Sequence, residues 1–496
     1  MEKIRTSCLF GQTEDYFQPY RNDTIGIHHY FQSPYGRKKI IYADWTASGR
    51  LYRPIERKIA EDFGPYVANT HTESNVTGTT MTQAYHHAGQ IIKKHVHAAP
   101  TDALILTGSG MTAAVNKLQR ILGLRLPEAY KDELKLPEED RPIIFITHME
   151  HHSNQLSWME TVGDVVILEP KADGCIDPKQ LKYLLEQNRH RKHKIGSFTA
   201  CSNVTGIQPP YYQLARLMHQ YGGTCFVDFS ASAPYVKIDM HPRSPLEKLD
   251  GIFFSPHKFL GGPGSSGVLL FDSKLYKNHI PDHPGGGTVN WTDPWGGRHY
   301  FSDLEIREDG GTPGFLQGIR AALCIKLKEK MGVHSMLRRE KVLLERLLTG
   351  MRKIPRLHIL QGDCIDRLGI VSFLIEGIHY QLVVKLLNDR FGIQVRGGCS
   401  CAGTYGHYLF HLDQKTSTEI MKQIDHNDLS HKPGWVRLSI HPIMTDEEVN
   451  FILKALNRIV EQHEEWTKDY RYDPGKNDFD QLKNTYPISL TQLFSL

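Results

Sequence analysis

Residues 250–264 constrain the fold of this chain more than any other stretch of its sequence. The apolar run 252–254 predicts a short buried strand, which Ser-Pro-His-Lys258 ends. Three glycines then permit a turn in which backbones approach closely. Lys258 therefore follows a strand end, where ligands collect in open α/β sheets. There it can lose its solvation and its proton and become an amine nucleophile, although a solvated loop lysine is the simpler alternative.

A second apolar run, residues 225–227, ends in Asp228, thirty residues upstream of Lys258. Two successive strands would then present the carboxylate and the lysine at the same edge of a sheet. A lysine that forms a Schiff base, together with a carboxylate for a pyridinium nitrogen, is the pair that pyridoxal phosphate requires. A structural ion pair between neighbouring strands is the alternative.

Several separated motifs resemble one known family. Val-Asp228 and Ser-Pro-His-Lys258, with the glycines that follow, are similar to the class V aminotransferase family of pyridoxal phosphate enzymes, and within it to the cysteine desulfurase / selenocysteine lyase branch. The resemblance covers about residues 40–465, with the motifs in the family's order. It implies an α/β protein of PLP-dependent transferase fold type I. Such a protein has a large domain, whose mixed, mostly parallel sheet is flanked by helices, and a smaller α+β C-terminal domain. It also implies pyridoxal 5′-phosphate as cofactor and an amino acid as substrate.

The chain has 496 residues, which is more than one compact core normally uses, so we expect two domains. The expected parts are an N-terminal segment, a large cofactor-binding domain, a small C-terminal domain and a C-terminal extension, at residues 1–40, 41–320, 321–465 and 466–496. Around the small domain the pattern predicts helices at 316–349, 380–390 and 445–464 and strands at 368–375 and 433–440. The charged residues 124–141 look like a surface insertion.

The composition excludes several classes of protein. With 59 basic and 55 acidic residues the net charge is only +4, too balanced to argue for nucleic acid or a membrane surface as partner. No apolar run reaches the roughly 18 residues of a membrane span, and the N-terminus lacks the apolar core of a signal peptide, so we expect a cytoplasmic protein. The eight cysteines are scattered, unlike a secreted disulfide framework.

A strand, a glycine turn and a helix start follow one another over residues 103–116. Backbone N–H groups at a helix N-terminus bind phosphate, and glycines let the phosphate come close. The candidate phosphate ligands are Gly110, Met111 and Thr112 and, by the family resemblance, Ser255 and His257.

The resemblance assigns roles to three more residues. His151 corresponds to the family histidine that stacks on the pyridine ring and exchanges protons. Asn203 corresponds to the asparagine that touches the cofactor's phenolic oxygen and the substrate carboxylate, although it could serve only as a turn residue. Thr312, in a Gly-Thr-Pro turn, implies a homodimer with shared active sites, because the family threonine reaches the phosphate of the partner subunit's cofactor. A metal cluster of His148, His151 and His152 is a rival interpretation, but no carboxylate or cysteine spacing supports it, and we expect no metal.

Residues 392–404 resemble the family loop that carries the sulfur-accepting cysteine. By this resemblance Cys401 is the nucleophile that takes sulfur from the substrate, and Arg396 lowers its pKa or binds substrate. Arg437 corresponds to the family arginine that would hold the substrate carboxylate bidentately. The sequence departs from the family at Cys399-Ser-Cys401, where His-His-Cys is usual, and at Ala231, where a glutamine is common. The Cys-x-Cys pair could instead form a redox switch or bind a soft metal.

These motifs leave three functional hypotheses. The first is a PLP-dependent cysteine desulfurase with catalytic Lys258, Cys401 and His151, which converts L-cysteine to alanine and an enzyme persulfide and could pass the sulfur to an acceptor protein. The second is an aminotransferase, lyase or epimerase that acts on another amino acid with the same cofactor. The third is a sulfur-carrier or assembly protein that keeps the cofactor for structure. Intact Lys258, Asp228 and Arg437 argue against the third.

Overall fold

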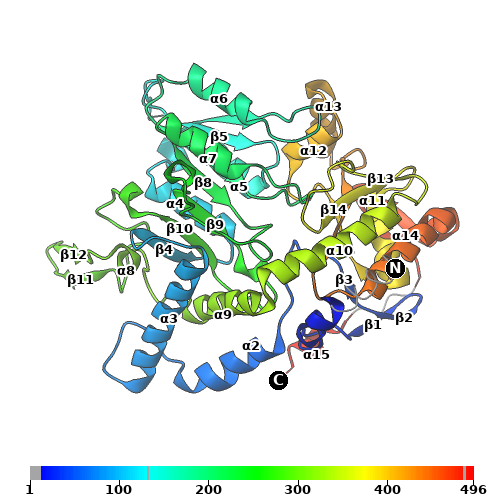
Figure 1. Ribbon diagram of the computed structural model, residues 1–496, viewed down its shortest axis with the longest axis horizontal. Coiled ribbons are helices and arrows are strands. Elements are labelled where there is room, and N and C mark those ends of the chain that lie inside the picture. The colour runs from blue at the N-terminus through cyan, green and yellow to red at the C-terminus, as the bar shows by residue number, and fades with distance from the viewer. Residues whose placement is uncertain (1–12, 131–132, 484–487, 496) are drawn as a thin grey trace.

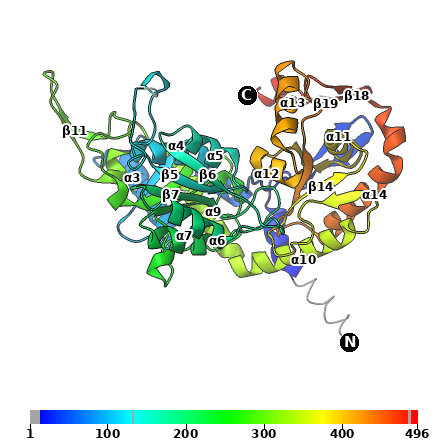
Figure 2. The ribbon, with the colours of Figure 1, turned by 90° about the horizontal axis from the view of Figure 1, so that it is seen from above.

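The computed structural model describes residues 13–130, 133–483 and 488–495. Figures 1 and 2 show two lobes side by side, joined where α9 (Phe315–Met331) passes into α10 (Val333–Met351). Gly332, with φ of 76°, separates these two helices, so the helical stretch predicted at 316–349 is broken there. The predicted domain boundary at residue 320 falls inside α9, and the division itself stays a prediction.

A seven-stranded sheet forms the centre of the larger lobe, in the order β4-β10-β9-β8-β7-β5-β6. Its strands are β4 (Asp102–Thr107), β5 (Ile143–Thr147), β6 (Asp164–Leu168), β7 (Lys194–Thr199), β8 (Thr224–Asp228), β9 (Gly251–Phe254) and β10 (Gly267–Asp272). β10 runs antiparallel to both of its neighbours, and the other pairs are parallel. The carboxyl ends of β5, β7, β8 and β9 therefore meet at one edge.

Helices cover both faces of this sheet, which explains why its strands are almost continuously apolar. The helices around it are α3 (Val76–His95), α4 (Met111–Ile121), α5 (His152–Met159), α6 (Pro178–Gln187), α7 (Tyr211–Gln220) and α9. Successive strand residues point to opposite faces. In β9, Phe253 packs in the cluster that contains α4 and α5, whereas Ile252 and Phe254 pack in the cluster that contains α3, α6, α7 and α9.

A four-stranded antiparallel sheet, ordered β13-β14-β17-β16, forms the centre of the smaller lobe. Its strands are β13 (Leu357–Ile359), β14 (Ile370–Ile375), β16 (Arg396–Gly398) and β17 (Trp435–Ser439). The helices that follow α10 are α11 (Tyr380–Phe391), α12 (Gly403–Leu409), α13 (Gln414–Asp425) and α14 (Asp446–Thr467). Thr445 and Glu448 form a reciprocal capping box at the start of α14, so the predicted helix start is confirmed.

Segments near both ends of the described chain, residues 13–42 and the hairpin 470–481, pack on the smaller lobe. Residues 13–22 are helical, and Arg21 makes a buried ion pair with Glu448. β3 (Ile41–Tyr42) pairs in parallel with β15 (Ile393–Gln394). This pairing leads the residues that follow β3 into the space between the two lobes. The hairpin of β18 (Tyr470–Asp473) and β19 (Asp478–Gln481) packs on α11.

The remaining elements lie at the surface or in connections. They are β1 (Tyr30–Ser33), β2 (Gly36–Lys39), α2 (Arg53–Arg57), a π-helical turn (Lys58–Phe63), β11 (Val289–Thr292), β12 (Arg298–Tyr300), α8 (Leu304–Arg307) and α15 (Leu490–Leu493). The β11–β12 hairpin projects from the larger lobe, away from the smaller one (Figure 2). Tyr130, in the expected insertion, is exposed. Within the described ranges, no helix is long and apolar enough to cross a membrane.

Candidate active site

A cavity of about 630 Å³ lies at the carboxyl edge of the seven-stranded sheet and takes residues from both lobes. We call it the active-site cavity. Every sequence-predicted site residue except Thr312 lines it, namely Gly110, Met111, Thr112, His151, Asn203, Asp228, Ser255, His257, Lys258, Arg396, Cys401 and Arg437.

Lys258 lies in the 3₁₀ turn Pro256–Lys258, directly after β9. Its loop is held by Gly49, whose N–H donates to the His257 carbonyl at 2.9 Å and where a Cβ would lie 1.9 Å from the Phe259 carbonyl oxygen. Burial lowers the pKa of Lys258 to about 8, and the negative charge of Asp228 partly offsets this shift. Around neutral pH the amine is therefore partly unprotonated and able to act as a nucleophile.

Asp228 ends β8 and is almost fully buried, with 3% of its surface exposed. One carboxylate oxygen accepts a hydrogen bond from the Ser230 N–H at 2.8 Å. Burial raises the pKa of Asp228, and it makes no ion pair within 4 Å among the described residues. A buried carboxylate without a counter-ion suits a cationic partner that enters the cavity, such as a protonated ring nitrogen.

The start of α4 forms a cradle for an anion. The Met111 N–H donates to Ser255 Oγ at 2.9 Å, and Thr112 Oγ1 lies 2.7 Å from Ser153 Oγ. A Cβ on Gly110 would lie 3.0 Å from Ser255 Oγ and 3.6 Å from His257 Nε2, so a side chain there would fill this space. Helix N–H groups and two hydroxyls around an open space fit a phosphate.

His151 caps α5 and accepts a hydrogen bond from the Ser153 N–H at its Nδ1, at 3.1 Å. Burial and the charge of Lys258 lower the pKa of His151 to about 3, so the ring is neutral and Nε2 carries its proton. His257 is neutral for the same reasons, with a pKa lowered to about 4. Both rings can therefore donate from one nitrogen without adding positive charge to the cavity.

The neighbouring histidines do not form a metal site with His151. His148 packs edge-on against Tyr405 and Tyr408, with Nδ1 3.2 Å from the Leu168 carbonyl. His152 Nε2 accepts a hydrogen bond from the Gly403 N–H at 2.8 Å. Among the residues that the structure describes, no group of three metal-ligating side chains gathers in a way that could hold an ion.

Two arginines and Asn203 form the far end of the cavity. Arg437 is 3% exposed, and its Nη1 donates to the Asn203 carbonyl at 3.1 Å. Its Nε and the side-chain oxygen of Asn203 are buried without a partner in the described chain. Arg396, on β16, is half exposed. Buried cationic and amide groups with unused hydrogen-bonding capacity suit a carboxylate ligand.

Ser400 and Cys401, in the loop that follows β16, line the cavity. The thiol is exposed, and both Ser400 and Cys401 adopt left-handed backbone conformations, with φ of 51° and 57°. The Cys401 carbonyl accepts from the His152 N–H at 2.7 Å, and the Ser400 carbonyl accepts from Asn203 Nδ2 at 2.7 Å. Both bonds tie the loop to the larger lobe. Cys399 is partly buried and packs beside an apolar cluster that contains Trp435.

Several residues at the site were not singled out from the sequence. Asp44 makes ion pairs with both Arg396 and Arg437. The Glu150 carboxylate is buried and accepts from Thr199 N–H and from Thr147 Oγ1, at 2.8 and 2.7 Å, which fixes the backbone next to His151. The only feature of the sequence that could have drawn attention to Asp44 and Glu150 is that each follows a strand or the turn after it.

Cys201, Ala231 and Thr312 complete the description of the site. Cys201 lines the cavity, but burial raises its pKa and its Sγ lies 3.3 Å from the Gly206 carbonyl, so it stays a protonated thiol. Ala231 offers no hydrogen-bonding side chain. Thr312 lies outside this cavity, is exposed, and donates from Oγ1 to Asn69 Oδ1 at 3.4 Å.

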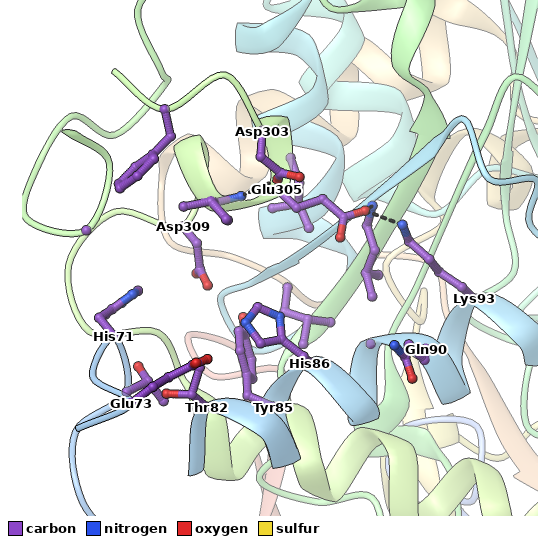
Figure 3. Close-up of a pocket in the computed structure, with 18 of the residues that line it drawn as sticks. His71, Glu73, Thr82, Tyr85, His86, Gln90, Lys93, Asp303, Glu305 and Asp309 are labelled. Atoms are coloured by element: carbon purple, nitrogen blue, oxygen red, sulfur yellow. Dashed lines mark hydrogen bonds and ion pairs between the residues drawn. The ribbon is translucent and has the colours of Figure 1, made fainter. Parts of the chain in front are cut away.

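A larger cavity, of about 840 Å³, opens between α3 and residues 287–309 (Figure 3). We call it the outer cavity. Lys93 forms an ion pair with Glu305 there, and burial together with the neighbouring Asp309 raises the pKa of Tyr85. Lys93 is thus already paired with a carboxylate of the same cavity.

The fold and the active-site cavity define an α/β protein with a partly neutral lysine, a buried carboxylate and an anion cradle at one sheet edge. A model of the class-V aminotransferase family matches residues 41–452, and the chain belongs to this family. The family predicted from the motifs is confirmed.

Similar proteins carry one recurrent name. A protein named probable cysteine desulfurase from Halalkalibacterium halodurans is 28% identical over 367 residues, which is 73% of this chain and 84% of the relative. A protein of the same name from Staphylococcus epidermidis is 27% identical over 371 residues, 74% of this chain and 84% of the relative.

Solved structures show the same fold. The apo structure of a cysteine desulfurase from Thermococcus onnurineus matches with a TM-score of 0.71 and 22% identity, over 89% of this chain and 98% of that one. The cysteine desulfurase CsdA from Escherichia coli matches with a TM-score of 0.68 and 20% identity, over 89% and 98%. The predicted fold, type I with a mostly parallel sheet flanked by helices, is confirmed.

Proposed function

We propose that this chain is a pyridoxal 5′-phosphate-dependent cysteine desulfurase, which takes sulfur from L-cysteine and leaves L-alanine. The observation that carries the proposal is that one cavity brings together Lys258, Asp228, Arg437 and Cys401. The names of the relatives support the same activity.

The residues of the cavity fit the cofactor at three points. The start of α4, with Ser255 and His257, would hold the phosphate, and Asp228 would accept a hydrogen bond from the pyridinium nitrogen. Lys258 Nζ would bind the aldehyde carbon, for which its lowered pKa of about 8 keeps part of the amine neutral. When bound, pyridoxal 5′-phosphate supplies an electron sink for the negative charge that develops at the substrate α carbon.

The remaining side chains bind the substrate and move protons. Arg437, helped by Arg396 and Asn203, would bind the substrate carboxylate through hydrogen-bonding capacity that is unused in the chain itself. Lys258 Nζ would act as the base that takes the proton from the substrate α carbon. His151 is neutral, so its ring would not repel a pyridinium cation in the cavity, and its Nε2–H could exchange a proton.

Cys401 would accept the sulfur. Its thiolate attacks the substrate sulfur, and the bond between that sulfur and the β carbon breaks. The electron pair stays with the carbon, which takes up a proton and becomes the methyl group of alanine. L-cysteine and the Cys401 thiol therefore give L-alanine and a Cys401 persulfide with no external oxidant. An acceptor protein or a small thiol would then remove the sulfur.

The test is the absorbance spectrum of the purified protein with added cofactor, before and after L-cysteine, with alanine and sulfide measured in the presence of dithiothreitol. We expect a visible cofactor band that L-cysteine shifts, and equal amounts of alanine and sulfide. The Cys401→Ser variant should keep the band and lose at least about 99% of alanine formation, because no other exposed thiol lines the cavity among the described residues. A band that L-cysteine leaves unchanged would contradict the proposal.

The second candidate is an aminotransferase, lyase or epimerase on another amino acid. It is favoured by the Cys401 loop, whose backbone is tied to the larger lobe through Ser400 and Cys401 themselves. This candidate predicts that Cys401→Ser leaves turnover of the preferred amino acid within about twofold of the unmodified protein.

We also propose a homodimer in which Thr312 serves the partner's site. Its exposed position outside the chain's own cavity supports this. Mixing Lys258→Ala and Thr312→Ala chains tests it. If the site is shared, half of the mixed dimers' sites carry both lesions and half carry none, so activity reappears. If Thr312 serves its own chain, every site carries one lesion, and the mixture stays as inactive as the two parents.

A further inference from the structure

Asp44 joins the two arginines at the far end of the active-site cavity. Its Oδ1 lies 2.9 Å from Nη2 of Arg437, and its Oδ2 lies 3.2 Å from Nε of Arg396. Both arginines line the cavity, whereas Asp44 is not among the lining residues. A substrate therefore meets the arginines, and Asp44 acts on it only through them.

The backbone fixes Asp44 against the strand that carries Arg437. The Ser439 N–H donates to the Ala43 carbonyl at 2.7 Å, and the Thr46 N–H donates to Ser439 Oγ at 3.0 Å. Asp44 is thus held across from β17, two residues from Arg437 along that strand. The ion pair is built into the fold and is not a chance contact of two mobile side chains.

The three side chains carry one surplus positive charge. The side chains of Arg437 and Asp44 are 4% and 14% exposed, so water screens their interaction weakly, while the side chain of Arg396 is 49% exposed. Two guanidinium groups and one carboxylate leave a net charge of +1 at this end of the cavity. One substrate carboxylate balances that charge, and a second anionic group would not be balanced.

We propose that Asp44 is a positioning residue that sets the charge selectivity of this end of the cavity. By neutralising one of the two arginines, it limits the substrate to amino acids with a single anionic group, such as L-cysteine. Substrates that carry a second carboxylate, a sulfinate or a phosphate on the side chain are disfavoured. The inference rests on the proposed function in one respect, that the arginines bind the substrate carboxylate.

Two unreactive acids of nearly the same size measure this selectivity directly. Succinate carries two carboxylates, and succinamate carries one carboxylate and one neutral amide. Their binding is measured by calorimetric titration of the protein without substrate, so the result does not depend on turnover. In the native protein succinamate should bind at least as tightly as succinate.

The Asp44→Asn variant keeps the shape of the side chain and removes its charge, which leaves both arginines unneutralised. We expect its affinity for succinate to rise about tenfold and its affinity for succinamate to change by less than about threefold. Asp44→Glu restores the charge and should restore most of the native ratio. Asp303→Asn, the same substitution in the outer cavity, should leave both affinities unchanged.

Two results would overturn the inference. The first is an equal change for the two acids in Asp44→Asn, which would mean that Asp44 only supports the fold. The second is unchanged binding of both acids in Arg437→Gln, which would mean that the acids bind elsewhere. A protein that shows the expected acid selectivity but does not desulfurate L-cysteine would keep the role of Asp44 and reject the proposed reaction.

Discussion

The active-site cavity is the smaller of the two cavities, yet it is the one whose lysine and carboxylate are free to bind a ligand. The outer cavity is larger, about 840 Å³ against about 630 Å³, and both are lined by a lysine and at least one carboxylate. In the outer cavity Lys93 is in direct contact with Glu305 (Figure 3). In the active-site cavity Lys258 and Asp228 are buried but make no ion pair with each other within the described chain.

The comparison shows that the same residue types can have a structural role in one cavity and a chemical role in the other. A paired lysine and carboxylate satisfy each other and leave little for a ligand. Buried groups that are held apart keep their charges unsatisfied, shift their pKa values and remain available to a ligand that satisfies both. The topology produces the separation, because β8 and β9 are neighbours and end at one edge, with Lys258 one turn beyond its strand.

The largest expected effect comes from removing each lysine in turn. Lys258→Ala should abolish the visible cofactor band and lower L-cysteine turnover by at least about a thousandfold, because nucleophile and proton carrier are lost together. Lys93→Ala should leave both unchanged and lower the free energy of unfolding by no more than about 1 kcal/mol, as for a partly exposed ion pair. The band, the alanine assay and urea unfolding check these outcomes. Similar losses of activity in both variants would erase the distinction between the cavities.

The second expected effect concerns the pH dependence of cofactor capture. Capture of pyridoxal 5′-phosphate by the cofactor-free protein needs the neutral Lys258 amine, whose pKa is lowered to about 8. The capture rate should therefore rise with pH up to about 8 and level off above it, with about a tenth of the amine neutral at pH 7. The nearby Asp228 carboxylate raises this pKa, so Asp228→Asn should move the rise to lower pH. Stopped-flow absorbance measures the rate.

The matched variant is Asp309→Asn, which neutralises a partly buried carboxyl of the outer cavity. Its capture profile should coincide with that of the native protein, because Asp309 is not among the charges that shift Lys258. A shift of the profile to higher pH in Asp228→Asn would show that the carboxylate does not act on the amine as a neighbouring charge.

The sequence could predict the elements whose pattern is local. The runs that end at Asp228 and at residue 254 became β8 and β9, and the Thr445 cap became the start of α14. It could not predict that Gly332 separates α9 from α10, since the apolar spacing continues through the break. Nor could it predict that residues 13–42 pack on the smaller lobe, because the pairing of β3 with β15 joins segments about 350 residues apart.

The site was predictable in its residue types and less so in its contacts. Motif resemblance placed Lys258, Asp228 and Arg437, whose roles stay predictions, and all three line one cavity. Asp44 was not predicted as a site residue, because the arginines with which it forms ion pairs lie more than 350 residues away in the chain. A long-range ion pair leaves no spacing pattern in a single sequence, unlike a strand or a helix cap.

The smallest expected effect tests what fills the outer cavity. Thr82 is 8% exposed, and its hydroxyl is buried without a hydrogen-bond partner among the described residues. If the cavity stays empty in solution, Thr82→Val removes an unsatisfied polar group at nearly constant volume. The free energy of unfolding should then rise by about 1 kcal/mol.

Thr80, on the same helix α3, is the matched control, because its hydroxyl donates to the Val76 carbonyl at 2.7 Å. Thr80→Val loses that bond and should lower the free energy of unfolding by up to about 1 kcal/mol, opposite in sign to Thr82→Val. Urea unfolding of both variants gives the comparison. If Thr82→Val also lowers stability, the hydroxyl has a partner that this chain does not supply. The outer cavity would then be completed by another molecule, such as a second copy of the chain, and the contrast between the two cavities would hold only for the single chain.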